Sequence, residues 1–92
     1  MGYMRDRMES ILKGELRVLA LQTRDNLGLT QSRMAELLEM SETSYSDIET
    51  GVYMCGTLTA ILLLMQQDNP SEFLDQLKKR FEKLNEEVIL PV

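Results

Sequence analysis

The stretch QSRMAELLEMSETSYSDIET, Gln31 to Thr50, decides the fold of this chain. Its apolar residues recur at the three- and four-residue steps of two short helices separated by a polar turn: Met34, Leu38, Met40, Tyr45 and Ile48. Ala35 falls where the two helices approach closely, so that only a small side chain fits. Ser41 stands just before the second helix and predicts its N-terminal cap. The stretch therefore predicts two crossed helices joined by a tight turn.

An earlier helix is predicted upstream, through residues 8–26. Its apolar residues form one stripe along a helix face: Met4, Met8, Ile11, Leu12, Leu16 and Leu19. Gly14 lies within this stripe and is expected to weaken or bend the helix. Gly28 predicts the end of the helix, because glycine takes the left-handed conformation cheaply. Thr30 predicts the cap of the next helix.

Two further helices are predicted downstream, after Gly51 ends the helix that follows Ser41. Thr57 is the expected cap of the first, LTAILLLMQQ, which is apolar nearly all round and is therefore expected at the centre of the molecule. The dipeptide Asn69–Pro70 predicts the start of a longer C-terminal helix. Strand-like alternation is absent, so the fold class is all-α. The last helix carries an apolar stripe: Phe73, Leu77, Phe81, Leu84 and Val88.

The composition excludes several functional classes. Cys55 is the only cysteine and histidine is absent, which argues against a disulfide framework, a zinc site and histidine-based catalysis. We therefore expect no cofactor, no metal and no enzymatic activity. The N-terminal residues lack the apolar region of a signal peptide, and the run Ala60–Met65 is far too short to span a membrane. A cytoplasmic protein without a membrane partner is expected.

The charge is unevenly distributed along the chain. The net charge is −5, and residues 15–69 alone carry three basic and eight acidic side chains. Residues 1–14 have a net charge of +1, and residues 70–92 have −1. A general polyanion binder would be basic in the middle of the chain.

Longer motifs around the opening stretch define a resemblance to a known family. They are R-x-x-L-G-L-T-Q at 24–31, M-A at 34–35, Ser41 and I-E-x-G at 48–51. Over about residues 16–67 the chain resembles the Cro and phage-repressor (XRE-type) helix-turn-helix family. The resemblance implies a five-helix, phage-repressor-like DNA-binding domain of bacterial or phage origin, with its third helix in the major groove. It also implies a sequence-specific transcriptional regulator, a repressor, that binds double-stranded DNA as a homodimer.

The resemblance organises the chain into two parts. Residues 1–69 form the helix-turn-helix domain, with the motif at 31–50 and a helical extension at 1–14. Residues 70–92 form the C-terminal helix and tail. The implied DNA-binding residues are Gln31, Ser32, Arg33, Glu42, Thr43, Ser44, Ser46 and Asp47.

Two implied roles have a physical reason and an alternative. Arg24 and Glu49 are expected to form a structural ion pair, which is partly buried and can be bidentate, so the structural interpretation of Glu49 is favoured over a functional one. Gln31 is either a phosphate contact or a surface glutamine at a helix start.

The sequence departs from the family pattern at the turn and on the third helix. Glu39 stands where glycine is usual. Glu42 and Asp47 stand where basic or amide side chains are common, which weakens the attraction for phosphates. The alternative function is a protein-interaction module with an acidic face: an antitoxin, an anti-repressor or a DNA mimic that binds a protein partner.

The C-terminal stripe also has two interpretations. Its later residues are candidates for a dimer interface, because a short domain has little core to cover them: Phe81, Leu84, Val88, Ile89 and Leu90. Alternatively, the whole stripe packs on the core of its own domain.

Overall fold

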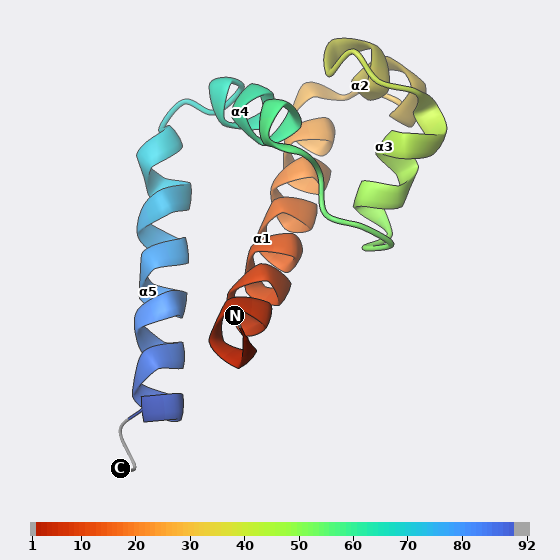
Figure 1. The fold of residues 1–92 in the computed structure, drawn as a ribbon. Helices are drawn as coiled ribbons and strands as arrows, with labels where there is room; N and C mark the ends of the chain where they lie inside the picture. The colour runs from red at the N-terminus through yellow and green to blue at the C-terminus, as the bar shows by residue number, and fades with distance from the viewer. Residues whose placement is uncertain (1, 90–92) are drawn as a thin grey trace.

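The structure, a computed structural model, describes residues 2–89, and side chains as far as residue 84. The described residues form α-helices and no strand, which confirms the all-α prediction (Figure 1). The helices are α1 (Tyr3–Leu27), α2 (Gln31–Leu37), α3 (Glu42–Glu49), α4 (Thr57–Met65) and α5 (Pro70–Ile89). Helix α1 begins earlier than predicted and runs through Gly14 as one helix.

Side-chain caps begin both helices of the central motif, as predicted. The Thr30 hydroxyl accepts a hydrogen bond of 3.1 Å from the backbone N–H of Arg33 in α2. The Ser41 hydroxyl accepts one of 3.1 Å from the backbone N–H of Ser44 in α3. Each cap satisfies a donor that the first helical turn leaves free.

Left-handed backbone ends α1 and forms the turn of the motif. Gly28 has φ 68° and its N–H bonds back to the last turn of α1. Glu39, between α2 and α3, has φ 57°, a conformation that costs a residue with a Cβ about 1–2 kcal/mol. The turn therefore has the backbone expected of the motif although glycine is missing.

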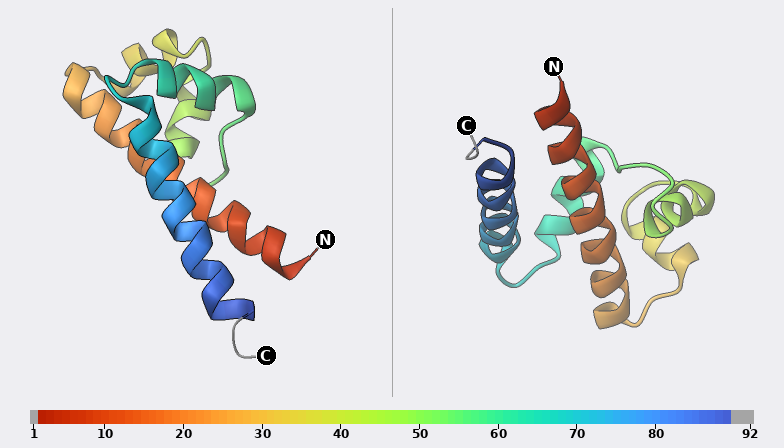
Figure 2. Two further views of the ribbon diagram at one scale, coloured as in Figure 1. Left: turned by 90° about the vertical axis from the view of Figure 1, so that its left-hand side faces the viewer. Right: turned by 90° about the horizontal axis from the view of Figure 1, so that it is seen from below.

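The helices are arranged around α1, as Figures 1 and 2 show. Helices α2 and α3 pack against each other, and α3 also packs on α1. Helix α4 contacts α1 and leads into α5, which runs back antiparallel beside α1. The molecule is elongated, with extents of 49 × 26 × 18 Å. The helix-turn-helix motif thus lies on one side of α1, and α5 lies on the other.

The core lies where α1, α2, α3 and α4 meet. Its largest fully buried side chains include Tyr45 and Ile48 from α3 and Met34 from α2. Ala35 of α2 is also buried in this core, where its small side chain was predicted to fit. Burial of these apolar side chains fixes the inner face of α3 toward the core.

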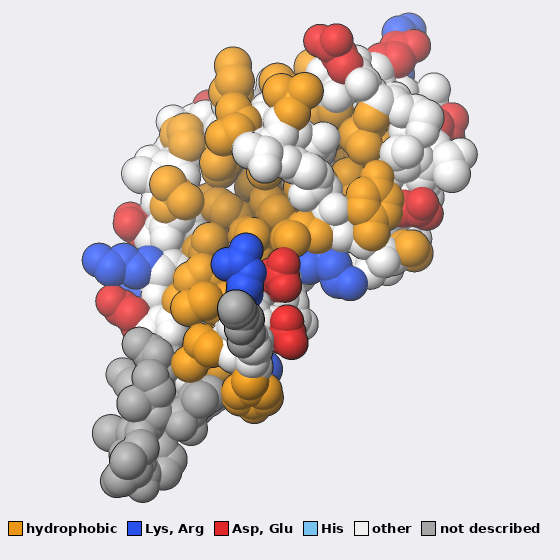
Figure 3. All heavy atoms as spheres, viewed as in Figure 1, with side chains coloured by type: hydrophobic (Ala, Val, Ile, Leu, Met, Phe, Trp, Pro, Cys, Tyr) orange, Lys and Arg blue, Asp and Glu red, His pale blue; other side chains and the backbone are white. Residues whose placement is uncertain are grey.

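Helix α4 differs from the prediction. Its N-cap is Gly56 without a side-chain bond, so Thr57 is the first helical residue and not the cap. Only Leu63 of this helix is buried. Leu58, Ile61 and Met65 are 48–69% exposed, and orange side chains cover α4 at the top of Figure 3. The prediction of a central helix was wrong, because α1 and α5 cover one face of α4 and leave the other uncovered.

Candidate nucleic-acid interface

Three side chains of α3 turn inward and hold the helix in place. Tyr45, Ile48 and Glu49 are buried. The Tyr45 hydroxyl donates a hydrogen bond of 3.3 Å to the carbonyl of Ala20 in α1. Burial raises the pKa of Tyr45 above its ordinary value, so its hydroxyl stays neutral.

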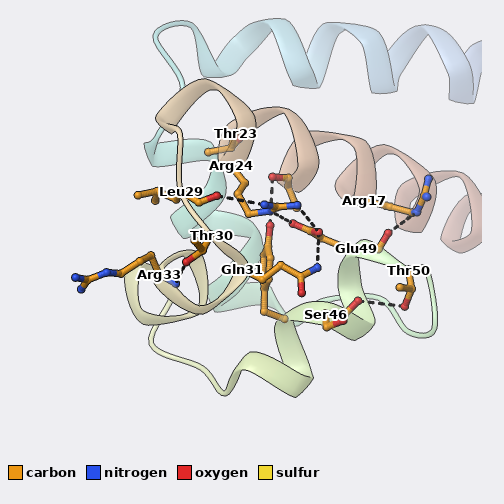
Figure 4. A network of polar contacts seen from close by, with 12 residues as sticks. Arg17, Thr23, Arg24, Leu29, Thr30, Gln31, Arg33, Ser46, Glu49 and Thr50 are labelled. Carbon is orange, nitrogen blue, oxygen red and sulfur yellow. Dashed lines mark hydrogen bonds and ion pairs between the residues drawn. The ribbon is translucent and has the colours of Figure 1, made fainter.

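Glu49 is the centre of a polar network that joins three segments (Figure 4). Arg24 of α1 donates to both carboxylate oxygens, from Nε at 2.6 Å and from Nη2 at 3.1 Å. Gln31 of α2 donates its amide N–H to Oε1 at 2.8 Å. The side chain of Glu49 is only 4% exposed, and that of Arg24 is 28% exposed. The structure therefore contains the ion pair that the resemblance implies.

The network shifts the pKa of both charged groups toward their charged forms. Burial alone raises the pKa of Glu49, but contacts with Arg24, Tyr45 and Gln31 outweigh burial and lower the pKa below its usual value. The hydrogen bond to Glu49 raises the pKa of Arg24. Arg24 is thus committed to α3 and to the carbonyl of Leu29, which it bonds at 3.2 Å.

Arg17 is a second cation at this helix, and the sequence did not indicate its role. Its Nε donates a hydrogen bond of 2.7 Å to the backbone carbonyl of Glu49 at the end of α3 (Figure 4). A cation near helix carbonyls stabilises a C-terminus. Gly51 follows with φ 78°, and a Cβ there would lie 3.6 Å from Arg17 Cδ. The contact joins residues 32 positions apart, so no local pattern predicts it.

The outer face of α3 is polar. Glu42, Thr43, Ser46 and Asp47 line a shallow hollow of about 290 Å³ together with Gln31. Each of these four side chains lies free of hydrogen bonds and ion pairs to the residues that the structure describes. This hollow brings together five of the eight residues predicted to bind DNA.

The other three predicted residues do not line this hollow. Ser44 is half-buried and its hydroxyl bonds the Ser41 hydroxyl at 2.9 Å. Ser32 is exposed on α2. Arg33 is also exposed and pairs with Glu36 at 3.1 Å. Exposed pairs of this kind are weak, so Arg33 can exchange Glu36 for another anion.

The predicted dimer residues fall in different environments. Phe81 is half-buried and lines an apolar groove of about 400 Å³ between α1 and α5, with Met8, Leu74 and Leu77. Leu84 is only 3% exposed because it packs within its own chain. The side chains of Val88 and Ile89, and the whole of Leu90, lie outside the described residues.

Comparison with known proteins identifies the motif. Residues 21–65 match the model of the family described as Helix-turn-helix. This part of the chain belongs to the Cro and phage-repressor-like (XRE-type) helix-turn-helix family. The family is a DNA-binding one, so the match supports a helix-turn-helix regulator that binds double-stranded DNA. The matched span includes α2, α3 and the Arg24–Glu49 pair, and thus the whole helix-turn-helix motif.

Searches among curated proteins and among solved structures gave no match. None of the helices in the described part of the chain is long and apolar enough to span a membrane.

Proposed function

We propose that this helix-turn-helix protein is a sequence-specific transcriptional regulator, a repressor, that places α3 in the major groove of an operator. One observation carries the proposal. The inner face of α3 is fixed by buried side chains and by the Glu49 network, while its outer face presents polar side chains that have no partner within the described chain. A rigid helix with free polar groups is what base reading requires.

The proposed contacts divide into two kinds. Ser32 and Arg33, at the exposed start of α2, are proposed to position the domain on the phosphate backbone. The outer residues of α3 are proposed to contact base edges. The proposed base-reading set is Glu42, Thr43, Ser44, Ser46 and Asp47. Gln31 lies between the two sets, and its amide nitrogen is held by Glu49.

The charge of the motif sets the expected affinity. Basic side chains on DNA-binding surfaces release counterions and supply much of the binding free energy. Here α2 and α3 contain one basic residue, Arg33, and four acidic residues, Glu36, Glu42, Asp47 and Glu49. A single domain is therefore expected to bind weakly.

We propose that a homodimer compensates for this weakness. Two copies bound about 34 Å apart, one turn of the duplex, double the contacts on an inverted-repeat operator. The proposed dimer surface is the groove between α1 and α5, which Phe81 helps to line. This groove is apolar and open to solvent, so a second copy could cover it. Val88, Ile89 and Leu90 remain candidates to extend it.

The acidic face favours one alternative function. A surface with Glu42 and Asp47 and without a basic residue on α3 suits a basic protein partner as well as it suits a base edge. In that case the protein would act as an antitoxin, an anti-repressor or a DNA mimic.

A charge reversal on α3 separates the two functions. If α3 lies in the groove, Glu42→Lys adds a phosphate or base contact, so non-specific DNA affinity rises and its salt dependence steepens by about one unit of log–log slope. Glu72→Lys is the matched control, since Glu72 lies in the first turn of α5 as Glu42 does in α3. Affinity would be measured by electrophoretic mobility shift over a salt series. Equal effects of both variants would show that α3 does not face the DNA.

A further inference from the structure

The free polar groups of α3 differ in how well the fold explains them. Glu42 lies in the first helical turn, where a carboxylate stabilises the positive end of the helix dipole. Asp47 lies in the last turn, two residues before α3 ends at Glu49, where a carboxylate opposes the dipole. Asp47 also makes no ion pair or hydrogen bond through its side chain with any residue as far as 84. Local stability thus explains Glu42 and leaves Asp47 unexplained.

The surroundings of Asp47 present acceptors rather than charged donors. Asp47 is half-buried and shares its hollow with Gln31, whose amide nitrogen points to Glu49 and whose oxygen points away from it (Figure 4). The Thr50 hydroxyl, one helical turn further, already donates to backbone carbonyls of α3. Within Glu42–Glu49 there is no lysine, arginine, asparagine or glutamine. The Thr43 and Ser46 hydroxyls in this hollow can donate or accept, but the Asp47 carboxylate can only accept, so a group that bonds Asp47 must bring a donor.

Base edges in the major groove differ in the donors they offer. Guanine presents two acceptors, N7 and O6, and thymine presents the acceptor O4. Both would oppose a carboxylate. Adenine offers its N6 amino group beside the acceptor N7, whereas cytosine offers its N4 amino group without a neighbouring acceptor on the same base. Cytosine is the base that matches a carboxylate best.

We infer that Asp47 is a specificity-determining residue that selects cytosine at one position of each operator half-site, by accepting a hydrogen bond from its N4 amino group. The inference rests on the proposed function, because it requires α3 to lie in the major groove. It adds the base that is read and the residue that reads it. The absence of arginine and lysine from α3 implies further that this helix makes no bidentate guanine contact.

Two experiments test the inference, one on the protein and one on the DNA. Operator sequences would be selected from a random duplex pool with the full-length wild-type protein and with Asp47→Asn. Asparagine donates and accepts side by side and matches adenine, so the preferred base at one half-site position changes from cytosine to adenine while other positions stay. Asp75→Asn, at an exposed position of α5, makes the same chemical change away from α3 and leaves the selected sequence unaltered.

The second experiment replaces that cytosine by thymine, with the paired base changed to match, and uses the wild-type protein. The loss of the donor is expected to weaken binding on the order of tenfold or more. This arm does not depend on the folding of a variant.

The outcomes separate the inference from the proposed function. Two results together support both the role of Asp47 and the regulator function. Asp47→Asn changes the selected base at one position, and the wild-type protein binds more weakly to the operator in which thymine replaces cytosine. Wild-type protein that selects a sequence without cytosine dependence, or Asp47→Asn that selects the same sequence, overturns the role of Asp47 and leaves the regulator function intact. Failure of the wild-type protein to enrich any sequence overturns both.

Discussion

The inner and outer faces of α3 use the same chemical group in opposite ways. Glu49 faces inward, and its carboxylate receives donors from Arg24 and Gln31. Asp47 is only two residues away but faces the hollow, where its carboxylate has no donor from the residues described. One carboxylate is satisfied within the fold, whereas the other is left for water or a ligand.

This difference distinguishes structural from functional acids on a recognition helix. A buried carboxylate needs its partners, because an unpaired buried charge is costly. A half-buried carboxylate near the C-terminal end of a helix is not stabilised by the helix dipole, and it remains free to bind a partner. Substitutions at the two positions should therefore change different properties, namely stability at Glu49 and recognition at Asp47.

The largest expected effect is on stability at the inner face. Glu49→Ala leaves the Arg24 guanidinium without its carboxylate and removes the acceptor of Gln31. We expect a loss of about 3 kcal/mol in the free energy of unfolding, near the lower end for such pairs, because Arg24 keeps some contact with water. Urea denaturation followed by circular dichroism measures the loss. A loss under about 1 kcal/mol would show that the network does not hold α3.

An effect of intermediate size on the free energy of unfolding is expected at acidic pH. The pKa of Glu49 is lowered in the folded protein, so the carboxylate stabilises the fold above its ordinary pKa of 4.5, and this stabilisation is lost as the pH falls through the folded value. The difference in unfolding free energy between the wild-type protein and Glu49→Gln should be full at neutral pH and shrink below about pH 4.5. Urea denaturation over a pH series checks this. If the unfolding free energies of the wild-type protein and Glu49→Gln differ by the same amount down to strongly acidic pH, the loss of stability in acid arises from other carboxylates.

The smallest effect on stability is expected at the outer face. Asp47→Ala removes a carboxylate that opposes the helix dipole and has no partner among the described residues. We expect a change within about 0.5 kcal/mol, either neutral or stabilising. The same denaturation experiment measures it beside Glu49→Ala. A loss above about 1 kcal/mol at Asp47 would make this residue structural and remove the contrast between the two faces.

Local patterns predicted much of the fold from the sequence. The caps at Thr30 and Ser41 and the helix end at Gly28 depend on neighbouring residues, and the structure contains all three. The Arg24–Glu49 pair joins distant residues, yet the family resemblance was enough to predict it. The residues on the outer face of α3 also follow from helical periodicity once the inner apolar positions are known.

The features that the sequence did not predict depend on how the helices pack in three dimensions. The uniform apolar run of α4 has no period, so the sequence could not show which face α1 and α5 would cover. The bond from Arg17 to the end of α3 and the turn of the Gln31 amide toward Glu49 require the folded positions of α1 and α2. Leu84 fits the stripe of a dimer helix equally well as that of a buried helix, and only packing places it in its own core.

The most direct test of base reading by α3 is a fluorescence-anisotropy titration of the wild-type protein with two DNA ligands. One is a random-sequence duplex and the other is a pool enriched by selection. Each titration would be made at about 50 and 200 mM salt, where phosphate-driven binding changes strongly. We predict tighter binding to the selected pool than to random DNA, with both affinities falling as salt rises. No binding to either DNA at the lower salt would contradict a DNA-reading α3 and assign its acidic face to a protein partner.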